Sequence, residues 1–264
     1  MGKAKTIITI TGVCLLLFSY RNMSGNINHP VGSNADQTSL KSVQTKTKST
    51  QTGSKSTQTK SKSIQKSSKS EPDNKSKDLG IVRIGTQAWA VANLNVITFR
   101  NGDSIPEART SKDWVTAGES GKPAWCYYNN NPANGLKYGK LYNWYAVNDP
   151  RELAPVGWTL SNADDWAMLI NYLGGQGVAG SKMKSISAWS EGNNGTNEAG
   201  FIGYPGGYRV ENGTFLNTAS IGIWWSSTEN NAQTAIDHYI ALSNSAGRSS
   251  SPKQRGESVR CLRK

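Results

Sequence analysis

The chain has 264 residues, with 30 Lys and Arg against 18 Asp and Glu, a formal net charge of +12. Residues 26–78 contain no aromatic side chain, and Ser, Thr, Lys or Gln occupies 34 of those 53 positions. Such a segment cannot bury enough apolar surface to offset its chain entropy. We therefore expect a disordered linker over residues 26–78 and one folded domain over residues 79–264. This composition excludes a long coiled coil, a solenoid array and a polytopic membrane protein.

The positive charge belongs mainly to the N-terminal part. Residues 1–78 carry 13 Lys and Arg against 4 Asp and Glu, whereas the rest of the chain carries 17 against 14. The linker lysines have no aromatic residues between them for base stacking, so we expect no nucleic-acid partner, although the tail could rest on anionic surfaces. Lys-Ser recurs every seven residues from residue 41 to residue 69 without an apolar seam, which indicates a spacer rather than a coiled coil.

Residues 1–25 combine a short basic start with an apolar run over residues 6–20. This pattern is typical of a secretory signal peptide, or of an N-terminal anchor if it is not cleaved. Cys14 follows Val13 rather than a small residue, which argues against lipidation at that cysteine. We expect an exported protein, either secreted or held at the cell surface.

In the folded part, the sequence predicts short strands separated by turns rich in Gly and Asn. The clearest helix is expected over residues 164–173, with Ser161 as its N-cap and Gly174–Gly175 at its end. Residues 141–147 are ambiguous, with a pattern that fits a short helix. The fold class is α+β, loop-rich, with one or two helices and strands expected over residues 81–84, 88–99, 124–128, 201–204, 208–210, 223–226, 236–242 and 258–262.

Six segments occur in an order that resembles a known family. They are VRIGTQAWAVANLNV, YYNNNPANGLKYGKLYNWYAVN, LAPVGWTLSNADDWAMLINYLGG, GFIGYPGGYR, IWWSSTE and SVRCLRK, and they extend over most of residues 80–264. The chain is similar to the Fibrobacter succinogenes major paralogous domain. Its GWTLSNADDW segment is also similar to sulfatase-modifying-factor domains. The resemblance implies a C-type-lectin-like fold in an exported bacterial surface protein, and it implies no particular activity.

Two cysteines, Cys126 and Cys261, remain after the expected removal of the leader. An even number of cysteines in an oxidising compartment predicts a disulfide between them, and two buried thiols are the alternative.

Residues suited to catalysis are scarce. His238 is the only histidine of the folded part, and no Gly-x-Ser-x-Gly motif accompanies it, so an ordinary strand residue is the better interpretation. Asp164 and Asp165 are adjacent and suit helix capping better than glycoside hydrolysis. The GxGxxG letters over residues 175–180 follow a helix rather than a strand, which removes the phosphate-binding context. We predict no enzyme and no resident cofactor.

A binding module fits the sequence better. Polar loops held on a scaffold commonly carry binding residues, and Trp rings suit sugar faces. Glycan recognition is the leading interpretation, and an adhesive or structural protein that recognises protein is the alternative. A hard cation such as Ca²⁺ could accept the carboxylate and amide oxygens of one loop. The predicted ligand-facing residues are Trp225, Glu229, Asn230 and Asp237 in one segment, and Asn129 and Asn131 in the other.

Overall fold

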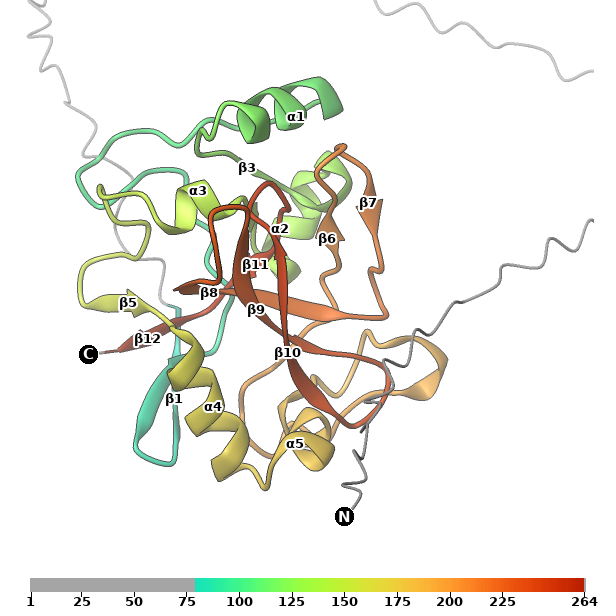
Figure 1. Ribbon diagram of the computed structural model, residues 1–264. Helices are drawn as coiled ribbons and strands as arrows, with labels where there is room; N and C mark the ends of the chain where they lie inside the picture. The colour runs from blue at the N-terminus through green and yellow to red at the C-terminus, as the bar shows by residue number, and fades with distance from the viewer. Residues whose placement is uncertain (1–78, 264) are drawn as a thin grey trace, which may run out of the picture. The chain divides into compact units, whose positions relative to one another are not determined.

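The computed structural model describes residues 79–263, so the leader expected over residues 1–25 and the linker expected over residues 26–78 lie outside the described residues. The described part is an α+β structure of several small sheets and short helices (Figure 1), which confirms the predicted class. Within this part no helix is both long and apolar enough to cross a bilayer. The helices are α1 (Ser111–Glu119), α2 (Gly135–Tyr138), α3 (Trp144–Val147), α4 (Ala163–Tyr172) and α5 (Gln176–Met183), with 3-10 turns η1 (Tyr128–Asn130), η2 (Pro132–Asn134) and η3 (Ser190–Gly192).

The strands form two four-stranded sheets and two small ribbons. One sheet has the order β1-β2-β12-β5, from β1 (Ile81–Ile84), β2 (Gln87–Ala90), β12 (Cys261–Arg263) and β5 (Trp158–Leu160). The other has the order β10-β9-β8-β11, from β10 (Ala246–Pro252), β9 (Thr234–Ile240), β8 (Gly222–Glu229) and β11 (Ser258–Val259). The ribbons pair β3 (Trp125–Cys126) with β4 (Leu141–Tyr142), and β6 (Tyr208–Arg209) with β7 (Phe215–Leu216).

The first sheet joins segments from both ends of the domain. Strand β12 lies between β2 and β5, with Leu262 opposite both Trp89 and Thr159. The β1–β2 hairpin and the last strand are therefore neighbours at the lower left of Figure 1. This order places Arg83 of β1 and Arg263 of β12 on one sheet although 180 positions separate them in the chain.

Both faces of the second sheet are covered, so the two adjacent tryptophans of β8 are both buried. Trp224 packs in an aromatic cluster with Trp166 of α4, at a centroid distance of 5.8 Å. Trp225 points to the opposite face, as neighbours in a strand do, and packs beside Tyr142 and Trp144 in a second cluster. Both rings therefore belong to the core, one on each face of the sheet.

Helix α4 forms where the sequence predicted a helix, but its N-cap is Asn162 rather than Ser161. The Asn162 side chain accepts a hydrogen bond from the Asp165 amide at 2.9 Å, and the Asp165 carboxylate accepts one from the Asn162 amide at 2.9 Å. Ser161 is buried one residue earlier, where its hydroxyl accepts a bond from the Trp166 indole at 2.9 Å. The observed N-cap therefore lies one residue after the predicted one, because the Ser161 side chain is hydrogen-bonded in the core.

The expectation of one or two helices is wrong, because α1 and α5 accompany α4 with nine and eight residues. Helix α5 lacks a strong apolar stripe, and its Gly177 and Gly180 are poor helix formers. Gly180 is fixed by packing, since a Cβ there would lie 2.5 Å from the carbonyl oxygen of Asn244. The predicted strand over residues 201–204 does not form, β2 ends at Ala90, and the polar strand β10 was missed.

The predicted strand over residues 258–262 divides at Arg260, whose guanidinium is buried. Its Nε and Nη2 donate to the Asn93 Oδ1 at 2.9 and 2.6 Å, and its Nη1 donates to the carbonyl oxygens of Ala90 and Phe201 at 2.9 and 2.7 Å. Burial lowers the Arg260 pKa to about 9. The Asn93 oxygen also accepts from the Trp224 indole at 2.9 Å, so one amide joins the two sheets.

Candidate functional site

An open groove of about 560 Å³ lies on the first sheet. We call it the hairpin groove: Arg83, Thr86 and Gln87 of the β1–β2 hairpin form one wall, Asn162 and Asp165 of the α4 entry form another, and Thr159, Ser227, Leu262 and Arg263 complete it. Most of these side chains carry a hydroxyl, amide or guanidinium group. The groove is therefore a polar surface over a sheet, and not an apolar pocket.

The hairpin and the helix are held in a fixed alignment. The Gln87 Nε2 donates to the Asp165 carbonyl oxygen at 3.0 Å, and the Trp89 indole donates to the Gln87 Oε1 at 3.2 Å. Further along, Gly85 has a φ of +60° and lies against Tyr172, whose Cδ2 would be 2.9 Å from a Cβ at that position. Asp165 and Tyr172, the two residues of α4 that the hairpin contacts here, are seven residues apart, or about 10 Å along the helix axis. The hairpin therefore lies alongside about two turns of α4.

Arginines dominate the charge of the hairpin groove. Arg83 and Arg263 are exposed, and neither has an ion-pair partner among residues 79–263; the Arg263 guanidinium lies 5.5 Å from the centre of the Trp158 ring. Asp165 is the one carboxylate in the lining, and it already accepts the Asn162 amide at the start of α4. The groove therefore presents two cationic groups and one carboxylate, which caps α4.

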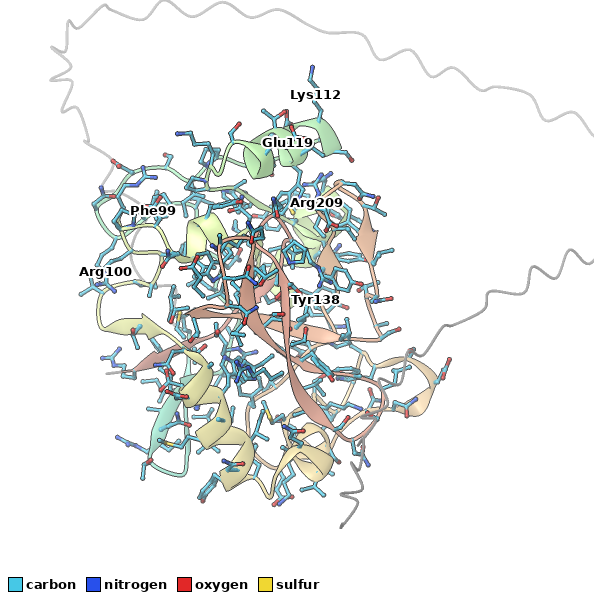
Figure 2. All side chains as sticks on the ribbon, viewed as in Figure 1. Phe99, Arg100, Lys112, Glu119, Tyr138 and Arg209 are labelled. Atoms are coloured by element: carbon cyan, nitrogen blue, oxygen red, sulfur yellow. The ribbon has the colours of Figure 1, made fainter. Side chains whose placement is uncertain are left out.

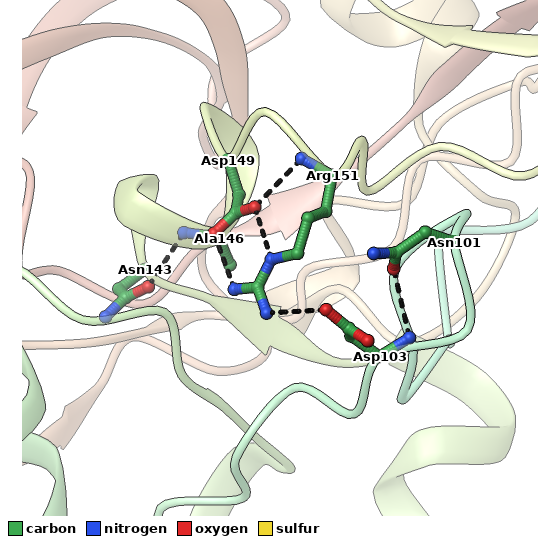
Figure 3. A network of polar contacts seen from close by, with 6 residues as sticks. All are labelled: Asn101, Asp103, Asn143, Ala146, Asp149 and Arg151. Atoms are coloured by element: carbon green, nitrogen blue, oxygen red, sulfur yellow. Dashed lines mark hydrogen bonds and ion pairs between the residues drawn. The ribbon is translucent and has the colours of Figure 1, made fainter.

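A second groove of about 390 Å³ lies on the other side of Thr159, Leu160 and Ser227, which line both. Its carboxylates are paired. Arg151 donates to Asp149 at 2.8 Å and to Asp103 at 3.2 Å (Figure 3), and its bond to Asp149 lowers the pKa of that carboxyl.

Residues 147–150 and 152–154 line this second groove, and Arg100, which is labelled in Figure 2, stabilises them. Arg100 pairs with Glu152 and donates to the carbonyl oxygens of Ala154 and Trp158, each at 3.0 Å. Asn143 caps α3 by accepting the Ala146 amide at 3.1 Å (Figure 3). The polar side chains around this groove are thus engaged in holding the loop.

Two of the residues predicted to face a ligand are in the core, and the prediction for them is wrong. Trp225 is 1% exposed, and its indole nitrogen donates to the Tyr142 carbonyl oxygen at 2.9 Å. Asp237 lies opposite Trp225 in the sheet and is fully buried, with the Ser249 hydroxyl donating to its Oδ2 at 3.2 Å. Asp237 is buried because β9 lies between β8 and β10 in the sheet and because this face of the sheet packs against the core.

The other predicted residues are exposed, and each shapes a turn. Glu229 forms an ion pair with Lys253, and the Asn230 Nδ2 donates to the Thr234 hydroxyl at 2.9 Å in the β8–β9 turn. Asn129 has a φ of +53°, and the Asn131 Oδ1 accepts the Ala133 amide at 3.0 Å. Contact of these four residues with a ligand stays a prediction.

The proposed Ca²⁺ ligands are not brought together. Glu229 lies opposite Ala235 at the turn, whereas Asp237 is two residues further along β9 with its side chain buried. Among residues 79–263 no three His, Cys, Asp or Glu side chains are grouped as metal ligands would be.

The predicted disulfide is absent, and the alternative of two buried thiols holds. Cys126 packs with Trp114 and Leu141, whereas Cys261 packs in another cluster with Trp225 and Tyr142. The two strands that carry them belong to different sheets. Burial raises the pKa of each thiol to about 12, so both are unreactive neutral groups in the folded domain.

His238 is confirmed as a residue of strand β9. Its ring stacks on Trp166, both ring nitrogens are buried without a hydrogen-bond partner, and it lines neither groove described above. Burial lowers its pKa to about 4.

Sequence reasoning missed the arginines of the hairpin groove. Arg83 lies in a strand that was predicted correctly, but no periodicity or spacing connects it with Arg263. Only the sheet order β1-β2-β12-β5, together with the packing of α4 beside the hairpin, places the two on one surface.

The fold and the groove define a small α+β domain with an open, polar and cationic surface site. The family model described as the Fibrobacter succinogenes major domain matches residues 82–263, and the chain belongs to this family. Comparisons with curated proteins and with solved structures give no match.

Proposed function

We propose that the domain is a non-catalytic binding module of an exported protein, secreted or at the cell surface, and that it recognises glycans in the hairpin groove. The observation that carries this proposal is the lining itself: Thr86, Thr159, Asn162 and Ser227 offer hydroxyl and amide groups along one open groove. Such groups both donate to and accept from sugar hydroxyls. An open polar groove suits a hydroxyl-rich chain better than a small apolar compound, which needs an enclosed pocket.

The absence of catalysis is part of the proposal. The carboxylates around the two grooves are committed: Asp165 to the cap of α4, Asp149 to Arg151, and Glu152 to Arg100. The buried titratable groups Asp237, His238 and Glu257 line neither groove. A general acid or base must reach its substrate within hydrogen-bond distance.

The C-type-lectin-like fold implied by the resemblance also belongs to this proposal. Such domains have a long loop region before their last strands. Here residues 184–221, between α5 and β8, contain only η3 and the two-residue strands β6 and β7. An experimental structure compared with lectin-like domains tests this assignment.

Recognition of protein is the second candidate. Met168, Tyr172 and Val178 on α4 and α5 are between 47% and 66% exposed, a set of apolar side chains that a protein surface could cover. Binding to a deglycosylated protein surface would favour this candidate, and loss of binding after deglycosylation would favour glycans.

The test is a groove-filling substitution. Thr159→Trp places a large ring between the two grooves, and we expect loss of glycan binding on an array with an unchanged melting temperature. Thr116→Trp makes the same exchange at an exposed position of α1, far from the hairpin in Figure 1, and should bind as the wild type does. Equal binding by both variants would place the site elsewhere, and no glycan binding by the wild type would refute the proposal.

A further inference from the structure

We propose that the hairpin groove selects acidic glycans, with Arg83 and Arg263 binding a carboxylate or sulfate group of one sugar unit. This inference rests on the proposed function and deepens it. Arg83 comes from the first strand of the domain and Arg263 from the last, and the sheet order brings both to the lining of one groove.

Both guanidinium groups are available to a ligand. In many proteins exposed arginines are neutralised by neighbouring carboxylates, as Arg109 is by Glu107 and Arg151 by Asp149 in this domain. Arg83 and Arg263 have no such partner among the described residues, and the single lining carboxylate caps α4. The planar guanidinium donates two parallel hydrogen bonds to an oxyanion, which makes arginine well suited to carboxylate and sulfate groups.

The surroundings of the arginine pair favour a sugar around the anionic group. Thr86, Thr159 and Ser227 line the same groove and suit the hydroxyls of the ring that carries the charge. Tyr172 is 66% exposed and lies about 10 Å along α4 from Asp165, with one side of its ring against Gly85. Aromatic rings held in this way provide a stacking surface, so a neighbouring sugar of an acidic oligosaccharide would reach Tyr172.

A nucleic acid is less well matched to these features. Phosphodiester chains are bound by several cationic groups along a continuous track with repeated aromatic stacking. The hairpin groove offers two arginines, and residues 79–264 carry a net charge of only +3. Two cationic groups fit a single charged sugar unit of a polysaccharide better than a run of consecutive phosphodiesters.

The experiment measures binding of the full chain to three immobilised polysaccharides at 50 and 500 mM salt: polygalacturonate, a sulfated galactan and a neutral xylan. We expect the acidic polymers to bind more tightly than xylan, and the binding to weaken at high salt. The Arg83→Ala/Arg263→Ala double variant should lose roughly tenfold or more in affinity for them, since a hydrogen bond to a charged group contributes about 1.5–3 kcal/mol. The polymer with the larger loss identifies the anion as carboxylate or sulfate.

The control removes two positive charges elsewhere. Lys112→Ala/Lys122→Ala changes two exposed lysines in and beside α1, at the far end of the domain from the hairpin (Figure 1), and should bind as the wild type does. Arg83→Glu alone, at an exposed hairpin position, gives a second test in case the double variant folds poorly. Tyr172→Ala should weaken binding of an acidic trisaccharide and leave that of the monosaccharide unchanged.

The outcomes separate this inference from the proposed function. Equal binding of acidic and neutral polymers that survives the double arginine exchange would overturn the inference and leave a glycan-binding module. Preference for a single-stranded oligonucleotide over every polysaccharide would overturn it in favour of a nucleic-acid site. No polysaccharide binding at all would overturn both.

Discussion

His238 lies flat against Trp166, with ring centroids 5.1 Å apart and ring planes 9° apart. The pair joins β9 to α4 in the aromatic cluster that also contains Trp89, Trp224 and Phe201. A charged imidazole in this position would have no carboxylate partner, and Arg248 of the neighbouring strand β10 adds repulsion. The folded state therefore holds His238 neutral.

The first prediction concerns acid stability. Because the pKa of His238 falls from 6.5 to about 4 on folding, its contribution is fully present above pH 6.5 and is lost as the pH falls through 4. We expect unfolding by urea to show a loss on the order of 2–3 kcal/mol between pH 7 and pH 4 from this residue. His238→Phe, which keeps the stacked ring, should remove that part of the pH dependence. An unchanged slope in the variant would contradict the assignment.

The second prediction concerns alkaline stability. Glu257 is fully buried near Asp237, and burial raises its pKa well above the usual 4.5 despite Arg255 at 3.7 Å. A group whose pKa is raised by folding contributes stability that is complete below pH 4.5 and is lost as the pH rises through its folded pKa. Glu257→Gln should therefore flatten the decline of the melting temperature as the pH rises above 4.5. A variant with the wild-type pH profile would show that Glu257 is charged in the folded protein.

The third prediction concerns the amide that joins the sheets. Asn93→Leu removes the acceptor shared by Arg260 and Trp224 and leaves a buried guanidinium short of partners. We expect a loss of about 3 kcal/mol or more in the free energy of unfolding. Asn212→Leu is the matched control, since Asn212 is exposed and its side-chain oxygen accepts a hydrogen bond from the Thr214 amide alone, at 2.9 Å. A comparable loss of unfolding free energy in the two variants would show that the acceptor shared by Arg260 and Trp224 is not important for stability.

The fourth prediction concerns the cysteines. Both thiols are buried, with pKa values raised to about 12, so peptides containing Cys126 or Cys261 should carry no alkyl label after treatment of the folded protein. In denaturant without a reducing agent, mass spectrometry should find both peptides fully labelled. If the two peptides stay linked until a reducing agent is added, the protein contains the Cys126–Cys261 disulfide and this prediction is wrong.

Local signals in the sequence predicted the parts of the fold that depend on local physics. The apolar stripe of α4, the acidic first turn and the Gly174–Gly175 stop are all within one segment, and the helix formed there. Short segments bounded by turn residues likewise predicted strands over residues 223–226 and 236–242, where β8 and β9 form. The six ordered segments gave the family, which the family model confirms over residues 82–263.

The tertiary structure alone decided which polar residues are exposed. Trp225 and Asp237 looked suited to a ligand, and they are buried because β8 and β9 have packing on both faces. Ser161 and Asn162 are both suitable N-cap residues. In the structure Ser161 is buried and accepts a hydrogen bond from the Trp166 indole, whereas Asn162 caps α4. Arg83 and Arg263 line one groove because β1 and β12 both pair with β2, and no local propensity encodes the proximity of residues 180 positions apart.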